Sequence, residues 1–168
     1  VFPRDGDSSE ALLAAADGCI RQITLAPELP GALDAVRRFV EAGVVVAVGH
    51  TEADYGQARA AFDAGASLLT HAFNAMPGIH HRAPGPVLAA LEDERVGLEV
   101  IADGHHVTAP AVRLLFEAAP GRVALVTDAM AGACADDGAF RLGTMEVTVR
   151  NGVAYLLDGA MHNNPQDN

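Results

Sequence analysis

Two histidines, His50 and His71, each come directly after a run of apolar residues, in "VVVAVGH" (44–50) and "ASLLTH" (66–71). Neutral imidazole nitrogens are ligands of Zn²⁺ and of other borderline divalent metals. Taken singly, either ring is more simply explained as a hydrogen-bonded core histidine. Because both rings follow a strand in the same way, and neighbouring parallel strands lie about 4.8 Å apart, we predict that they share one metal ion.

A third candidate, Asp128, ends the apolar run "VALVTDA" (123–129). Its simplest role is to cap a following helix. A carboxylate that faces a metal-activated water has another use, because a metal lowers the pKa of that water to about 7 and the carboxylate takes the remaining proton. The same carboxyl group can then protonate a leaving amine. The two histidines and the aspartate together predict metal-assisted hydrolysis of an amide or an ester.

Two polar stretches supply candidates for binding a substrate. In "HAFNAMPGIHHR" (71–82), Asn74, the amide of Ala75 and Arg82 suit a phosphate or a carboxylate, although the stretch could equally be a solvated loop. The stretch "ADGHH" (102–106) offers further polar groups, and its glycine permits a tight turn. The candidates in this second stretch are Asp103, Gly104, His105 and His106.

The segments that must position these residues alternate between strand-like and helix-like patterns. Strands are expected at 20–28, 44–50, 66–71, 97–106 and 122–130. Helices are expected at 29–43, from Thr51 to about Ala64 with a Thr51–Asp54 capping box, at 83–93 and at 108–119. This alternation implies parallel strands joined by right-handed crossovers, so all strand C-termini share one edge. In (β/α) barrels that edge carries the active site. The residues expected there are Glu28, His50, His71, Asp103, His105, His106 and Asp128.

The remainder of the sequence has a different pattern. Residues 138–161 show short apolar and polar alternation, and Asn151-Gly152 is typical of a two-residue turn, which predicts an antiparallel β unit. We therefore expect a partial (β/α) barrel over 1–134, and the start of a β-sandwich with a loose tail over 135–168. Five strand–helix units do not close a barrel of eight. Either the sheet is open, or three units precede this sequence, which lacks an initial methionine.

The composition excludes several classes of partner. Lys and Arg number 11 and Asp and Glu number 22, and the net charge of −11 argues against nucleic acid and anionic membranes. No apolar run approaches the ~20 residues of a membrane helix, and the polar start is unlike a signal peptide. The isolated Cys19 and Cys134 fit no metal motif and are expected as reduced thiols in a cytoplasmic protein.

Five short motifs occur in order: "TLAPE", "GHT", "THAFNAMP", "IADGHHV" and "LVTDA". Over about residues 20–158 the chain resembles the N-acetylglucosamine-6-phosphate deacetylases of the amidohydrolase superfamily. The resemblance implies strands 4 to 8 of a (β/α)₈ barrel, followed by part of a small β-sandwich. It also implies hydrolysis of N-acetylglucosamine 6-phosphate to glucosamine 6-phosphate and acetate, with one divalent metal: Zn²⁺, or else Fe²⁺, Co²⁺ or Mn²⁺.

The resemblance also assigns roles to the candidate residues. His50 and His71 would bind the metal, and Asp128 would act first as general base and then as general acid. Arg82 would hold the phosphate from the neighbouring subunit of a homodimer. The residues implied to bind the sugar phosphate are Asn74, Ala75, Arg82, Asp103, Gly104, His105 and His106.

Two departures from the family pattern leave alternatives open. The family's third metal ligand, a glutamate in a "HLEGPF"-type segment, and a histidine in a "GAH" segment have no counterpart here. Glu28 is a different glutamate and is not assigned as a ligand, and His80 and His81 are given no role. One alternative is a non-catalytic truncated relic or assembly fragment. Another is a different amidohydrolase, such as a cyclic-amide hydrolase, against which "HAFNAMP" with Arg82 argues.

Overall fold

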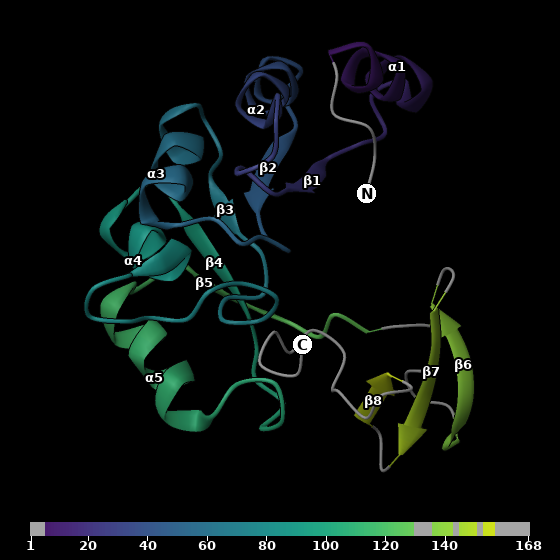
Figure 1. The fold of residues 1–168 in the computed structure, drawn as a ribbon, viewed down its shortest axis with the longest axis vertical. Coiled ribbons are helices and arrows are strands. Elements are labelled where there is room, and N and C mark those ends of the chain that lie inside the picture. Colours follow the sequence, from purple (N-terminus) through teal and green to yellow (C-terminus); the bar gives the residue numbers. More distant parts are fainter. Residues whose placement is uncertain (1–5, 130–135, 143–144, 151–152, 157–168) are drawn as a thin grey trace.

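The fold contains two sheets, which a computed structural model describes over residues 6–129, 136–142, 145–150 and 153–156 (Figure 1). The larger sheet has five parallel strands, β1 (Gln22–Leu25), β2 (Val45–Val48), β3 (Leu68–Leu69), β4 (Gly97–Ile101) and β5 (Val123–Val126). The smaller sheet is antiparallel, with β6 (Gly138–Leu142), β7 (Met145–Arg150) and β8 (Val153–Leu156). The predicted parallel α/β fold and the small antiparallel unit are both confirmed.

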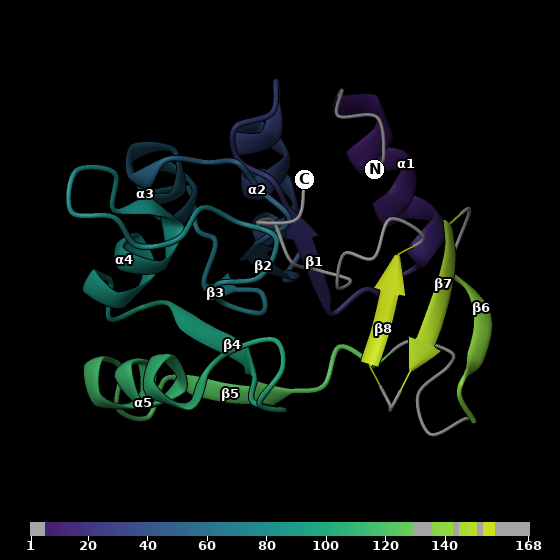
Figure 2. The same ribbon diagram turned by 60° about the horizontal axis from the view of Figure 1, so that its bottom comes forward.

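Four helices connect the parallel strands, and a fifth precedes them. The helices are α1 (Gly6–Ala16), α2 (Ala32–Glu41), α3 (Tyr55–Asp63), α4 (Gly85–Glu92) and α5 (Ala109–Ala118). Figures 1 and 2 show α2 to α5 as a layer along one side of the five strands. Right-handed crossovers between neighbouring strands place their helices on one face in this way. None of the described helices is long and apolar enough to cross a membrane.

The core fills the space between the helical layer and the sheet. Val46, Val48 and Val100 point from the strands into a cluster that includes Phe39 of α2 and Phe62 of α3, and all five side chains are buried. Val46 and Val48 alternate along β2, and Leu98 and Val100 along β4, as expected for side chains on one face of a strand. The core therefore fixes which face of each strand turns away from the helices.

The five-stranded sheet is strongly curled. The strands follow one another in chain order, so β1 and β4 are separated by two strands. In a flat sheet their axes would lie roughly 14 Å apart. Gln22 of β1 nevertheless donates a 3.1 Å hydrogen bond to Glu99 of β4, and the hydroxyls of Thr24 and Thr70 lie 2.9 Å apart. The face opposite the helices is therefore concave.

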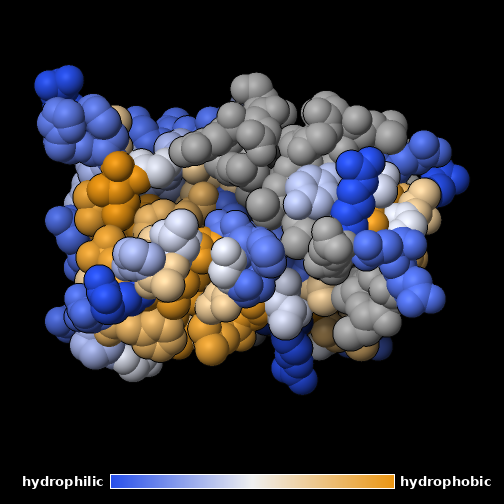
Figure 3. Space-filling model, turned by 90° about the horizontal axis from the view of Figure 1, so that it is seen from below, coloured by the Kyte–Doolittle hydropathy of each residue, from blue (hydrophilic) through white to orange (hydrophobic). Residues whose placement is uncertain are grey.

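The sheet ends at β5, where apolar side chains remain in contact with solvent. Leu125 of β5 is 65% exposed, and Leu114 and Phe116 of α5 are exposed as well. Figure 3 shows apolar side chains gathered on this side of the parallel-sheet half. Large apolar residues left exposed beside an unpaired strand mark a surface suited to contact with further protein.

Several predicted elements differ in detail from the structure. Thr51 does not cap α3, because the N-cap is Asp54, whose carboxylate accepts from Gln57 N while Gln57 Oε1 accepts from Asp54 N. The hydroxyl of Thr51 instead donates to Glu28. Helix α1 was not predicted, and the predicted third strand at 66–71 shortens to two residues. The predicted turn at Asn151-Gly152 lies outside the described residues, but the pairing of Arg150 with Val153 confirms the hairpin around it.

Charged residues stabilise the edge of the sheet at which the parallel strands begin. Asp93, in the loop between α4 and β4, is 6% exposed and binds Arg95 at 2.6 and 2.8 Å. Hydrogen bonds from Arg95 lower the pKa of Asp93 to about 2, although burial opposes this shift. Arg122 donates to four main-chain carbonyls around the end of α4, those of Ala90, Leu91, Asp93 and Val96. This network secures the end opposite the candidate site.

Candidate metal centre

His50 and His71 meet at the C-terminal edge of the parallel sheet. Each lies two residues beyond its strand, β2 or β3, and the two Nε2 atoms are 2.9 Å apart. The ring centroids are 4.6 Å apart and the ring planes cross at 77°. His71 is buried, whereas His50 is exposed. The same nitrogen of each ring is therefore directed at one point, which is open to solvent on the His50 side.

A glycine allows the two strand ends to come this close. Gly49 precedes His50, and a Cβ atom placed on it would lie 2.7 Å from Cβ of Thr70, the residue before His71. It would also lie 3.0 Å from Cγ2 of Thr24 on β1. Any side chain at this position would force the strand ends apart, so Gly49 is part of the site although it has no functional group.

The backbone at the strand ends is strained. His50, His71 and Asp128 have φ angles of +48°, +29° and +47°, in the left-handed region that residues with a Cβ seldom adopt. Such conformations cost on the order of 1–3 kcal/mol each and cluster at functional sites. The loop after His71 bends sharply as well, with positive φ at Phe73 and Ala75. The three residues predicted to do chemistry thus share an unusual backbone conformation.

The loops that follow the two histidines are tied together. Thr51 N donates to Ala75 O at 2.9 Å, and this bond links the segment after His50 to the loop after His71. Asn74 is buried, and its Nδ2 donates to His71 O at 3.3 Å. Asn74 and Ala75, both predicted to bind substrate, therefore lie within the hydrogen-bonded loop beside the two rings.

The predicted substrate residues after β4 form a compact turn. Asp103 Oδ1 accepts from the main-chain N of His105 at 2.8 Å and of His106 at 2.9 Å, and Oδ2 lies 2.7 Å from His106 Nδ1. Gly104, with φ +81°, makes the turn possible. Burial opposes the negative charge of Asp103, but the hydrogen bonds from His106 and His105 outweigh it and lower the pKa of this carboxyl. Asp103 thus orients the His106 ring, and Nε2 is the ring nitrogen left to face a ligand.

Asp128 and Arg82 are two predicted site residues on the surface. Asp128 follows β5 by two residues and is exposed. Arg82 is also exposed, in a turn closed by Ala83 N donating to His80 O at 3.0 Å. Within the described ranges, no three His, Cys, Asp or Glu side chains are grouped closely enough to hold a metal ion.

The histidine pair nevertheless suits a cation. Two imidazole Nε2 lone pairs cannot face each other at 2.9 Å unless a proton or a cation lies between them. His71 Nδ1 is buried and has no hydrogen-bond partner among the described residues. A ring that binds metal through Nε2 carries its proton on Nδ1 and usually donates it to a neighbouring group. Two imidazoles directed at one point are the kind of donor pair that tetrahedral metal sites use.

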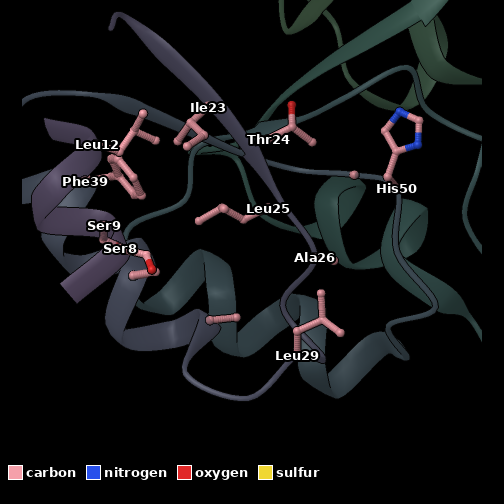
Figure 4. A pocket seen from close by; sticks show the side chains of 13 residues that line it. Ser8, Ser9, Leu12, Ile23, Thr24, Leu25, Ala26, Leu29, Phe39 and His50 are labelled. Atoms are coloured by element: carbon pink, nitrogen blue, oxygen red, sulfur yellow. The ribbon is translucent and has the colours of Figure 1, made fainter. Parts of the chain in front are cut away.

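A pocket of about 340 Å³ adjoins the site between α1, β1 and α2. Its wall is largely apolar, with Leu12, Ile23 and Phe39 at one end, and Figure 4 shows His50 at the opposite margin. The pocket runs along β1, the other edge strand of the described sheet. It therefore provides space beside His50, with few polar groups to bind a sugar phosphate.

Comparisons with known proteins find relatives of one kind. No protein-family model matches the chain. An N-acetylgalactosamine-6-phosphate deacetylase of Escherichia coli O157:H7 is 45% identical over 152 residues, which are 90% of this chain and 40% of that protein. An N-acetylglucosamine-6-phosphate deacetylase of Vibrio furnissii is 40% identical over 152 residues and 38% of its own length.

A solved structure is similar over almost the whole chain. It is a mutant N-acetyl-D-glucosamine-6-phosphate deacetylase of Mycobacterium smegmatis in complex with N-acetyl-D-glucosamine-6-phosphate, 45% identical with a TM-score of 0.93. The resemblance to the N-acetylglucosamine-6-phosphate deacetylases is confirmed. The match includes 98% of this chain but only 43% of the deacetylase chain. The chain likewise spans about 40% of the length of the curated relatives.

The parts that three residues play at this site were not predicted from the sequence. Gly49 was treated only as part of a strand, Thr51 was assigned to a helix cap, and Glu28 was left without a role. Thr51 and Glu28 are 23 residues apart and are joined by a hydrogen bond. Glu28 was expected at the strand ends, but its bond to Thr51 depends on how β1 and β2 pair, which the spacing along the chain does not show.

Proposed function

We propose that this chain carries part of the active site of a metal-dependent hydrolase. The enzyme would release acetate from N-acetylglucosamine 6-phosphate and leave glucosamine 6-phosphate. One observation carries the proposal: the 2.9 Å convergence of His50 and His71 Nε2 at the strand ends, in a chain 45% identical to such deacetylases. The metal is Zn²⁺ in the first instance, with Fe²⁺, Co²⁺ or Mn²⁺ as alternatives.

In this proposal the curled sheet is strands 4 to 8 of a (β/α)₈ barrel, and β6 to β8 belong to a small β-sandwich. The sequential strand order, the helices on one face and the Gln22–Glu99 bond across two strands support the barrel. The catalytic groups then lie on the C-terminal rim, as they do in barrel enzymes. The exposed apolar residues beside β5 are where a closing strand and helix would pack.

The reaction follows from the chemistry of the strand-end residues. His50 and His71 would hold a divalent metal, which would supply Lewis acidity to polarise the acetyl carbonyl and to acidify water. Asp128 accepts a proton as the water oxygen attacks the carbonyl carbon. It returns that proton to the nitrogen as the C–N bond breaks, so that acetate and the free amine leave. The remaining metal ligands come from outside the described residues.

The substrate would be held by the loops around the histidine pair. His106, oriented through its 2.7 Å contact with Asp103, and Asn74 would bind polar groups of the sugar. Arg82, at the exposed tip of its turn, would bind the phosphate of a substrate in the neighbouring subunit of a homodimer. An arginine that projects from the surface suits binding across a subunit boundary better than binding within its own site.

Acetate release from N-acetylglucosamine 6-phosphate tests the proposal. The chain is assayed alone, and then with the portion of the Vibrio furnissii relative that it does not cover, each with and without Zn²⁺. Acetate release that requires both the added portion and the metal supports a catalytic segment. No release under any condition favours the non-catalytic alternative.

The relatives differ in the hexosamine that they are named for, so a second substrate is needed. The Escherichia coli relative is named for N-acetylgalactosamine 6-phosphate. Measuring kcat/KM for both sugar phosphates decides between them, because they differ only in the configuration of one hydroxyl group. We expect N-acetylglucosamine 6-phosphate to be the better substrate, as the similar solved structure contains this compound.

A further inference from the structure

Glu28 is a polar strand-end residue that the proposed reaction does not use. It lies three residues beyond β1 and is half-buried. One carboxylate oxygen, Oε1, accepts from the main-chain N of Glu52 at 2.9 Å, and the other, Oε2, accepts from the hydroxyl of Thr51. Both partners belong to the segment that directly follows His50. The carboxylate is therefore turned towards the main chain beside the ring.

The same segment is held from its other side. Thr51 N donates to Ala75 O at 2.9 Å, in the loop after β3, and Thr51 Oγ1 accepts from Ala53 N at 3.0 Å. Before the histidine, Gly49 N donates to Leu25 O of β1 at 3.2 Å. The residues on both sides of His50 are thus bound to neighbouring strand ends. Thr51 connects the ends of β1, β2 and β3.

His50 needs this support because of its backbone conformation. Its φ of +48° is unfavourable for a residue with a Cβ, and the surrounding hydrogen bonds must hold it there. A relaxed φ would rotate the Cα–Cβ bond and move the ring away from His71. Since His50 is exposed, side-chain packing alone does little to hold its ring in place.

We propose that Glu28 is a positioning residue for His50. Its carboxylate holds the main chain of Thr51 and Glu52, and so keeps His50 Nε2 directed at the point that His71 Nε2 also faces. The effect of Glu28 on metal affinity rests on the proposed metal centre. Its effect on the position of the His50 ring does not. Residues that orient metal ligands typically change the affinity by roughly 10- to 100-fold when they are replaced.

The test measures Co²⁺ binding to the 168-residue chain by visible absorption. We expect Glu28→Ala to weaken Co²⁺ binding by roughly 10- to 100-fold. Glu28→Gln should retain most of the affinity, because its amide oxygen can accept from Glu52 N and its amide nitrogen can donate to Thr51 Oγ1. Thr51→Val, which keeps the side-chain shape but loses the hydroxyl, should show a smaller loss in the same direction. It provides the test if Glu28→Ala does not fold.

A matched control separates positioning from loss of stability. Asp54→Ala removes the N-cap of α3, three residues beyond Thr51, and touches neither Glu28 nor His50. We expect Asp54→Ala to lower the thermal midpoint and leave Co²⁺ affinity unchanged. Equal affinity losses in Glu28→Ala and Asp54→Ala would overturn the proposal, as would unchanged affinity in Glu28→Ala.

A metal-free measurement distinguishes failure of this proposal from failure of the metal centre. In the metal-free chain, nuclear Overhauser contacts between the His50 and His71 ring protons report on their proximity. We expect these contacts in the unaltered chain and in Asp54→Ala, and their loss in Glu28→Ala. If the unaltered chain bound no Co²⁺, the metal centre would fail while the ring contacts still decided the role of Glu28. The proposed role of Glu28 is overturned if the ring contacts persist in Glu28→Ala. It is also overturned if they are absent from the unaltered chain.

Discussion

Gly49 and Thr70 lie so close together that a Cβ atom on the glycine would be 2.7 Å from Cβ of the threonine. This contact joins the ends of β2 and β3 immediately before the two histidines. The position of the candidate metal site therefore depends on a residue without a side chain. Because the contact is with a Cβ atom and not with a flexible side-chain end, the strand ends must move if Gly49 is replaced.

Gly49→Ala should separate the two histidines. We expect a loss of about 1–3 kcal/mol in the free energy of unfolding, as for other overpacked sites, and weaker Co²⁺ binding. Urea denaturation and metal titration measure the two effects. Gly56→Ala is the matched control: a Cβ there meets only Asp54 Oδ1, at 3.4 Å, in the first turn of α3. Alanine at this helical position should maintain or raise stability.

Removing either imidazole should abolish high-affinity metal binding. If His50 and His71 are the two proposed ligands, loss of either leaves one. His50→Ala and His71→Asn should therefore each fail to retain one equivalent of Zn²⁺. Elemental analysis after dialysis measures bound metal. His81→Ala, at an exposed position in the following loop, should behave as the unaltered chain. Equal metal content in all three variants would show that the ion binds elsewhere.

Asp128→Asn should separate metal binding from catalysis. In a catalytically complete assembly we expect kcat to fall by about 10²- to 10⁴-fold, because an amide cannot accept and return the proton. Metal content should stay nearly intact, since Asp128 is proposed to move a proton and not to hold the metal. Asp136→Asn, at another exposed carboxylate, provides the control. Loss of metal with retained turnover would contradict the assigned roles.

The pairing of buried Asp93 with exposed Arg95 should make stability depend on pH in the acid range. Hydrogen bonds from Arg95 lower the pKa of Asp93 from 3.8 to about 2, so the folded state favours the ionised form. The stabilisation is complete above the unfolded pKa near 3.8 and is lost as the pH falls through about 2. Asp93→Asn should therefore cost about 1–3 kcal/mol at pH 7, and the difference should shrink between pH 4 and pH 2.

Urea denaturation at pH 7, 4 and 2.5 measures this dependence. Asp63→Asn is the control, because Asp63 binds the same arginine at 3.1 Å but is 62% exposed. Its loss should change the unfolding free energy by less than about 0.5 kcal/mol. A constant difference between the unaltered chain and Asp93→Asn at all three pH values would disprove the linkage.

Much of the site was predictable, because the residues that stand at the strand ends can be recognised from local sequence patterns. Apolar runs ending in His50, His71 and Asp128 mark buried strands with polar ends. Parallel strands joined by helices must bring those ends to one edge, so the meeting of His50 and His71 could be inferred before any coordinates. The small antiparallel unit was likewise predictable from alternation and a turn dipeptide.

Other features were decided by contacts between residues far apart in the chain. Thr51 and Asp54 have capping-box spacing, yet Thr51 bonds Glu28, and Asp54 takes the cap. Helix α1 has no strong periodic pattern, and its leucines are half-buried against the core. Such outcomes depend on which residues the tertiary structure brings into contact, and spacing along the chain does not specify those contacts.

The sequence by itself determined the order of strands and helices and which residues stand at the strand ends, because backbone periodicity and crossover handedness act over short stretches. Only the tertiary structure decided the curl of the sheet, seen in the bond from Gln22 to Glu99, and the support of His50 by Glu28. These pairs are separated by 77 residues and by about 22–24 residues along the chain. Their contacts exist only once the strands have paired and the sheet has curved, so no short-range pattern could encode them.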